Sequence, residues 1–64
     1  MYVIEIRQVA ESITGLVSKG GKVLKFDDES KARIFGKENI EKSRYIACWE
    51  AITENTAKIR GHEI

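Results

Sequence analysis

Two adjacent glycines between two lysines, in VSKGGKVLKF at residues 17–26, constrain the fold more than any other feature. Gly20 and Gly21 suit a two-residue turn that requires positive φ at both central positions, so they predict a β-hairpin. The register of this turn pairs Lys19 with Lys22, Val17 with Leu24 and Gly15 with Phe26. The apolar members of these pairs form a stripe that we expect to face the core. The lysines then lie at the exposed end.

The residues before the hairpin are typical of a half-buried strand. In MYVIEIRQV, β-branched and aromatic residues alternate with polar ones. Tyr2, Ile4 and Ile6 would face one side of the sheet. Glu5 and Arg7 would face the other side.

A short helix is expected after the hairpin, in DDESKARIFG. Asp27 or Asp28 can cap its first turn, where carboxylates also suit the positive end of the helix dipole. Ala32 and Phe35 would then point toward the sheet, and Gly36 would end the helix. The polar stretch KENIEKS that follows either continues the helix or connects it to the next element.

The last third of the chain has two interpretations. As a helix, which we favour, SRYIACWEAITENTAKIRG would be capped by Ser43 and would place large side chains on one face. The residues at helical spacing are Tyr45, Trp49, Ile52, Thr56 and Ile59. As the alternative, RYIACWEAI and AKIRGHEI form a hairpin whose first strand is buried on both sides. The turn TENT of that hairpin lacks glycine, which counts against it.

These elements predict a single α+β domain that spans residues 1–64. A small antiparallel sheet, made of the N-terminal strand and the hairpin, would pack against one or two helices, with a helix in the C-terminal third. The alternative is a ββαββ arrangement with a C-terminal hairpin. The expected core consists of Tyr2, Ile4, Ile6, Val17, Leu24, Phe26, Ala32, Phe35, Trp49 and Ile52.

The size and composition of the chain argue against several functions. A chain of 64 residues makes one small domain, which buries only about 60% of the surface that its unfolded form exposes. Eleven basic and ten acidic residues give no overall attraction to nucleic acid or to anionic lipid. No apolar run approaches the ~20 residues of a membrane span. A single cysteine and the lack of a signal-like start indicate a cytoplasmic protein.

Catalysis and metal binding have few candidate residues. Cys48 and His62 are the only residues of their types, too few for an intramolecular disulfide or a four-ligand zinc site of Cys and His. We expect Cys48 to be a small buried hydrophobic residue rather than a nucleophile. The carboxylates of Asp27, Asp28 and Glu29 suit helix capping better than acid–base chemistry. The sequence therefore predicts a protein that is not an enzyme and that uses no metal or other cofactor.

Basic residues on the hairpin and the following helix form one candidate surface for a partner or for nucleic acid. They are Lys19, Lys22, Lys25, Lys31, Arg33 and Lys37. A two-stranded ribbon can enter the major groove of DNA, with lysines that reach the phosphates. The hairpin, however, has no arginine for guanine recognition and no aromatic residue among its lysines for base stacking. Nucleic-acid binding is therefore the alternative function.

Tyr45 and Trp49 form the second candidate surface, a protein interface. In the helical interpretation the two rings are four residues apart and lie together. They belong either to the core or to an interface, where Tyr and Trp are favoured. A protein partner or a second copy of the chain would complete their burial.

The order of strand, hairpin GLVSKGGKVLKF and helix DDESKARIF resembles that of many small proteins of phages and other mobile elements. In those proteins one helix packs on a small antiparallel sheet, and some inhibit host defence complexes, as several anti-CRISPR proteins do. The order is also similar to the arm-type DNA-binding domains of tyrosine recombinases, a resemblance that places Lys19, Lys22 and Lys25 on a DNA-facing ribbon. This chain lacks the usual arginines and the strongly basic character of those domains. The first resemblance covers residues 1 to about 40 and is architectural.

We therefore expect a small non-enzymatic binding or regulatory protein, derived from a phage or mobile element, that docks on a protein partner and blocks or modulates it. The alternative is a small DNA-binding or recombination accessory protein that uses the basic hairpin. A homodimer with a structural role is the third hypothesis.

Overall fold

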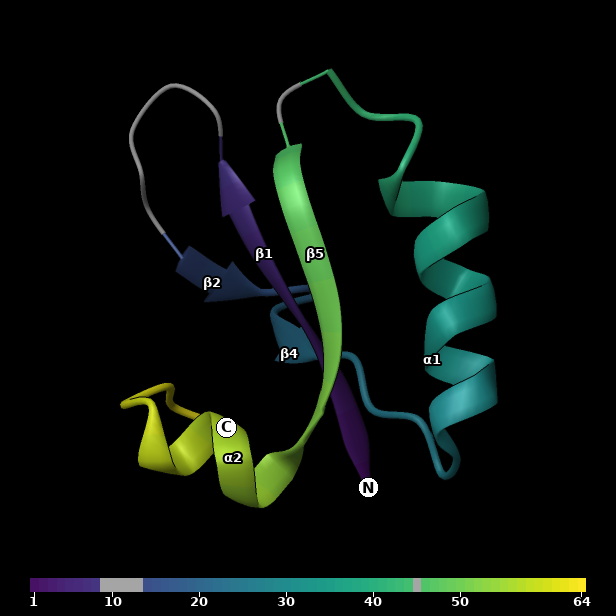
Figure 1. The fold of residues 1–64 in the computed structure, drawn as a ribbon. Helices are drawn as coiled ribbons and strands as arrows, with labels where there is room; N and C mark the ends of the chain where they lie inside the picture. Colours follow the sequence, from purple (N-terminus) through teal and green to yellow (C-terminus); the bar gives the residue numbers. More distant parts are fainter. Residues whose placement is uncertain (9–13, 45) are drawn as a thin grey trace.

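The computed structural model of the protein describes residues 1–8, 14–44 and 46–64 (Figure 1). The strands are β1 (Tyr2–Gln8), β2 (Thr14–Leu16), β3 (Ser18–Lys19), β4 (Lys22–Val23) and β5 (Ile46–Thr53). The helices are α1 (Glu29–Phe35), the π-helical segment η1 (Gly36–Ile40) that continues it, and α2 (Glu54–Ile59). The predicted α+β class is confirmed.

Antiparallel pairing joins β2, β1 and β5 into a three-stranded sheet with β1 at its centre. Strands β3 and β4 form a separate hairpin, which an isolated bridge between Tyr2 and Phe26 ties to β1. Figure 1 shows α1 on one side of the three-stranded sheet and α2 on the other. The predicted antiparallel sheet, with an N-terminal strand, a hairpin and helices packed on it, is therefore present.

Strand β1 is buried on both faces, which differs from the predicted one-sided pattern. Val3 and Ile4 are neighbours in the chain, so they point to opposite faces, and both are fully buried. Val3 packs with Ile52 and with Ala57 of α2. Ile4 therefore points to the α1 side. Because the central strand has a helix on each side, apolar residues are needed on both faces.

The hairpin turn forms as predicted. Gly20 and Gly21 have φ angles of +62° and +80°, a left-handed conformation that glycine adopts without steric cost. The predicted pairs that form here are Lys19 with Lys22 and, through a backbone hydrogen bond, Val17 with Leu24.

The predicted pair of Gly15 with Phe26 is wrong. Gly15 belongs to β2 and pairs with Ile6, whereas Phe26 bridges Tyr2. The two hairpin arms separate below the turn because each finds a partner in β1, which is the longer strand. The hairpin is thus a short ribbon whose two arms continue to different parts of β1.

Helix α1 begins as predicted. Asp28 is its N-cap residue, and the Asp28 side chain accepts a hydrogen bond of 3.1 Å from the backbone N–H of Lys31. Ala32 is fully buried. The ring of Phe35 packs against that of Phe26, with 5.4 Å between their centroids. Both predicted contact residues of the helix therefore point inward.

Gly36 is the C-cap residue of the α-helix, as predicted, but the chain does not leave the helical path there, because η1 continues it to Ile40. The ring of Trp49 lies directly on Gly36. A Cβ atom at position 36 would overlap the ring of Trp49. The glycine therefore makes room for the tryptophan.

The favoured helix over the last third is wrong for residues 46–53, which form β5 and pair along the length of β1. A C-terminal helix is present, as predicted, but it is short. Thr53 rather than Ser43 caps it, and the Thr53 hydroxyl accepts a 3.1 Å hydrogen bond from the backbone N–H of Thr56. Ile59, which the helical pattern placed on the apolar face, is 78% exposed.

The alternative interpretation of this region is correct for its first strand and wrong for its second. The first strand corresponds to β5, whose residues Trp49 and Ile52 face opposite sides of the sheet. The second would have started in residues that form α2. Pairing with β1 overrides the helical spacing of the large residues in this segment.

The core is small. Its buried hydrophobic residues, among those described, are Val3, Ile4, Ala32, Ile40, Ile52 and Ala57. Of the predicted core, Ile4, Ala32 and Ile52 are buried. The other predicted members are half-buried: Tyr2, Ile6, Val17, Leu24, Phe26, Phe35 and Trp49.

Candidate functional site

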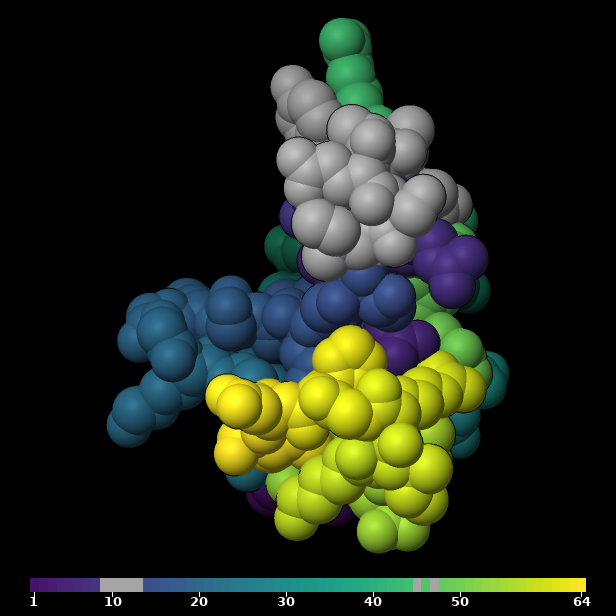
Figure 2. Space-filling view, turned by 90° about the vertical axis from the view of Figure 1, so that its left-hand side faces the viewer, coloured from purple at the N-terminus to yellow at the C-terminus, as the bar shows by residue number. Residues whose placement is uncertain are grey.

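The hairpin tip, by which we mean Lys19, Gly20, Gly21 and Lys22, consists of exposed residues. In Figure 2 the hairpin projects from the body of the protein toward the left of the view. Lys19 and Lys22 are cross-strand partners, so their side chains share one face, and like charges in that position repel each other. Within residues 1–8, 14–44 and 46–64 neither lysine forms an ion pair. An anionic partner would relieve this repulsion.

Three of the other predicted basic residues are paired with carboxylates. The pairs are Lys25 with Glu54 at 3.2 Å, Lys31 with Asp27 at 3.0 Å and Arg33 with Glu29 at 3.0 Å. The hydrogen bond from Lys25 lowers the pKa of Glu54, and the hydrogen bond from Lys31 lowers the pKa of Asp27. These carboxylates stay ionised, so they offset much of the positive charge beside them.

The structure does not bring the six predicted basic residues onto one continuous surface. Lys31, Arg33 and Lys37 lie on the α1–η1 layer. Val23 of the hairpin packs against the cluster around Val3, on the opposite side of the sheet. The hairpin tip is therefore a small basic site of its own.

A small concavity lies beside the hairpin tip, between the hairpin and the residues that follow α2. Its lining consists of Gly21, Lys22, Val23, Lys25, Glu63 and Ile64. It combines cations, one carboxylate and two aliphatic side chains. This mixture is typical of a protein interface, which has apolar and polar parts.

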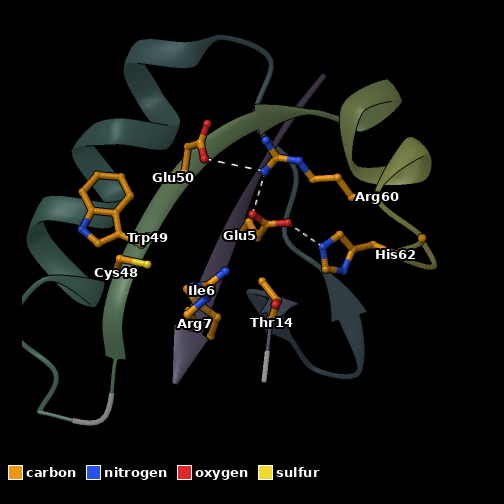
Figure 3. A pocket seen from close by; sticks show the side chains of 10 residues that line it. Glu5, Ile6, Arg7, Thr14, Cys48, Trp49, Glu50, Arg60 and His62 are labelled. Atoms are coloured by element: carbon orange, nitrogen blue, oxygen red, sulfur yellow. Dashed lines mark hydrogen bonds and ion pairs between the residues drawn. The ribbon is translucent and has the colours of Figure 1, made fainter. Parts of the chain in front are cut away.

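A second concavity lies on the α2 side of the sheet and holds a charged network (Figure 3). Arg60 Nη1 lies 2.7 Å from Glu5 Oε1 and 3.6 Å from Glu50 Oε2, and His62 Nε2 lies 2.7 Å from Glu5 Oε2. Glu5 and His62 are only 13% and 14% exposed. The network fastens the residues after α2 onto β1. No local motif in the sequence indicates this network, because Glu5 and His62 are 57 positions apart.

Cys48 is exposed, so the prediction that it is buried is wrong. It lies on β5, at the edge of the sheet, where the core does not cover it. Cys48 and His62 line the same concavity, but Figure 3 shows them on opposite sides of Glu5, and no hydrogen bond joins them. The Nε2 atom of His62 is taken up by Glu5. This arrangement does not form the nucleophile–base contact of covalent catalysis.

Of the two residues of the predicted aromatic interface, Tyr45 lies outside the described residues. Trp49 is half-buried, and its ring packs on Gly36 of the helix layer. The indole ring of Trp49 therefore contributes to packing between β5 and η1.

In the part of the chain that the structure describes, no group of three or more His, Cys, Asp or Glu side chains could hold a metal ion. Also within these residues, no helix has both the length and the apolar character needed to cross a membrane.

No family model, curated protein or solved structure matches the chain. The resemblances to small phage proteins and to recombinase arm domains therefore stay predictions.

Proposed function

We propose that this chain is a small non-enzymatic binding protein that docks on a protein partner through its hairpin tip and thereby blocks or modulates that partner. The observation that carries the proposal is the pair Lys19 and Lys22, which are opposite each other, exposed and free of ion pairs within the described residues. The Gly20–Gly21 turn and the short ladder below it place both lysines on the same face of the ribbon. The partner surface is expected to be acidic.

The surroundings of the tip favour a protein over DNA. Val23 and Ile64 line the concavity beside Lys22 and offer apolar contact area, which a protein partner can use and a phosphate backbone cannot. A duplex contact would also draw on the other basic residues, yet Lys25 is already paired with a carboxylate. Net charge near zero gives no long-range attraction to nucleic acid.

A charge reversal at the tip tests this function. The double variant Lys19→Glu/Lys22→Glu and the wild type are used to capture proteins from a nuclease-treated lysate of the source cells. The matched control, Lys37→Glu/Lys42→Glu, makes the same change in net charge at exposed positions on and after η1. We expect a protein that the wild type and the control capture and the tip variant does not.

The same three proteins are titrated with a mixed-sequence DNA duplex at several salt concentrations. Binding through phosphates falls steeply as salt rises, whereas docking that includes apolar contacts falls less. Duplex binding that is salt-sensitive and lost in the tip variant would replace the proposed function with the DNA-binding alternative. Equal capture by the tip variant and the wild type would contradict the proposal.

A further inference from the structure

The outer edge of β5 is open to pairing with another strand. β5 is an end strand of the sheet, with β1 on its inner side. The backbone groups of Tyr2 and Ile4 form hydrogen bonds with Phe26 and Val17, on the side of β1 away from β5. The backbone groups of the alternate residues Val3, Glu5 and Arg7 therefore point to β5. Those alternate residues take Ile52, Glu50 and Cys48 as their partners. The backbone N–H and C=O groups of Trp49 and Ala51 therefore point to the outer edge, where no backbone hydrogen bond from a described residue reaches them.

This edge lacks the features that usually prevent strand addition. β5 has eight residues, no proline and a single charged side chain, Glu50. The register shift in its pairing with β1 lies near Ile46, so the segment from Cys48 to Thr53 is regular. In Figure 1, β5 lies in front of β1 and no described segment crosses it.

The charges beside the edge indicate what pairs with it. Glu50 is 61% exposed, and its one ion pair among the described residues is the 3.6 Å contact with Arg60. Arg7 is exposed and has no ion pair within the same residues. Arg7 is the cross-strand partner of Cys48, and both line the concavity in Figure 3. The Glu50 carboxylate, with its single long ion pair, and the Arg7 guanidinium, unpaired within the described residues, thus lie on the same face of the sheet. They are diagonal neighbours on adjacent strands.

We infer that a second copy of this chain pairs antiparallel with β5 about a two-fold axis at Trp49. In this register Glu50 lies opposite Cys48 of the second copy, and Arg7 of that copy lies one strand further on. Two strand spacings are about 10 Å, which a glutamate and an arginine side chain can span over the small cysteine. The two-fold axis forms this contact twice, and the charge complementarity identifies a second copy as the occupant.

The neighbouring registers do not provide this complementarity. A two-fold axis at Cys48 places Glu50 opposite Ile46, whose partner on β1 is the uncharged Gln8. A two-fold axis at Glu50 places two glutamates directly opposite each other, which is destabilising. An axis at Ala51 places Glu50 opposite Ile52, which offers no counter-charge. The inference goes beyond the proposed function, because β5 and the hairpin lie at opposite edges of the sheet. The dimer would carry its two hairpin tips at opposite ends, available for two-point docking.

Charge reversal in trans tests the dimer. Arg7→Glu alone places two acidic groups together at each symmetric contact, and Glu50→Arg alone places two basic groups together. When the two single variants are mixed, the heterodimer has one native contact and one reversed contact, and both are attractive. Analytical ultracentrifugation over a range of concentrations gives the dimer affinity of each sample. We expect about a tenfold weaker dimer for each single variant and a return to the wild-type affinity in the equimolar mixture.

The matched control mixes Lys42→Glu with Glu38→Arg, which alter exposed charges on and after η1, outside β5 and outside the proposed Glu50–Arg7 contact, and should leave the affinity unchanged. A wild type that stays monomeric at millimolar concentration would overturn the inference, as would single variants that dimerise like the wild type or a mixture without recovery. None of these results affects capture by the hairpin tip, so the failure of the dimer and the failure of the proposed function are distinguishable.

Discussion

The α1–η1 layer and the β3–β4 hairpin are built in opposite ways. The layer is held by close packing: Ala32 is fully buried, and Trp49 lies on Gly36 without room for another carbon atom. The hairpin is held by its turn and a short ladder, and all four residues of its tip are exposed. Substitutions in the layer should therefore change stability, whereas substitutions at the tip should change binding and leave stability almost unaffected.

The largest loss of stability is expected on the face of β1 that points to α1. Ile4→Ala removes a fully buried side chain from a small core and should lower the free energy of unfolding by about 2–5 kcal/mol. Ile34→Ala is the control, since Ile34 is on α1 but 55% exposed, and it should cost less than about 0.5 kcal/mol. Urea denaturation measures both. Similar losses for the two variants would mean that packing in this layer is not the main source of stability.

The contact between helix and tryptophan is the next test. Gly36→Ala should destabilise the protein by about 1–3 kcal/mol, because the added methyl group overlaps the Trp49 ring and one of them must move. Gly15→Ala is the matched change, since no atom lies within 4 Å of a Cβ there and φ at Gly15 is not positive. The indole fluorescence should shift in the first variant and not in the second. A neutral or stabilising effect at position 36 would contradict the close approach.

The hairpin turn should give a smaller and purely local effect. Gly20→Ala places a side chain at φ +62° and should cost about 1 kcal/mol. Gly20→Asn should cost less, because asparagine tolerates this conformation and Asn-Gly suits the same turn. Thermal unfolding compares the pair. An equal cost for alanine and asparagine would show that the left-handed conformation is not what the turn requires.

The smallest effect concerns the ion pair that joins the hairpin arm to α2. The hydrogen bond from Lys25 lowers the pKa of Glu54 in the folded protein. The pair therefore stabilises the fold above the ordinary glutamate pKa, and this contribution is lost as the pH falls through the lowered folded pKa. Lys25→Met should reduce the loss of stability between about pH 7 and pH 3, whereas Lys58→Met, on α2, should not. An unchanged pH dependence in Lys25→Met would show that the Lys25–Glu54 pair does not contribute to stability.

Local signals in the sequence were sufficient for the features that depend on neighbours in the chain. The Gly20–Gly21 turn needs only its own backbone conformation, and the Asp28 cap needs only a residue three positions later. These could be predicted because no distant contact competes with them. The lysines of the hairpin tip were found for the same reason.

Features that depend on distant contacts could not be predicted in this way. The segment of β5 has helical spacing, yet pairing with β1 makes it a strand. Nothing near Gly36 in the sequence indicates that Trp49 lies on it. The contact of Glu5 with His62 joins the two ends of the described chain, and Arg7 and Glu50 become neighbours only through the register of the sheet.

The central claim is that the tip binds while the layer holds the fold, and one variant tests both parts. Lys19→Glu/Lys22→Glu is measured for its free energy of unfolding and for capture of the protein partner in the same preparation. We predict a change in stability of less than about 0.5 kcal/mol together with loss of capture. Retained capture in a folded variant, or a loss of stability comparable to that of Gly36→Ala, would contradict the claim.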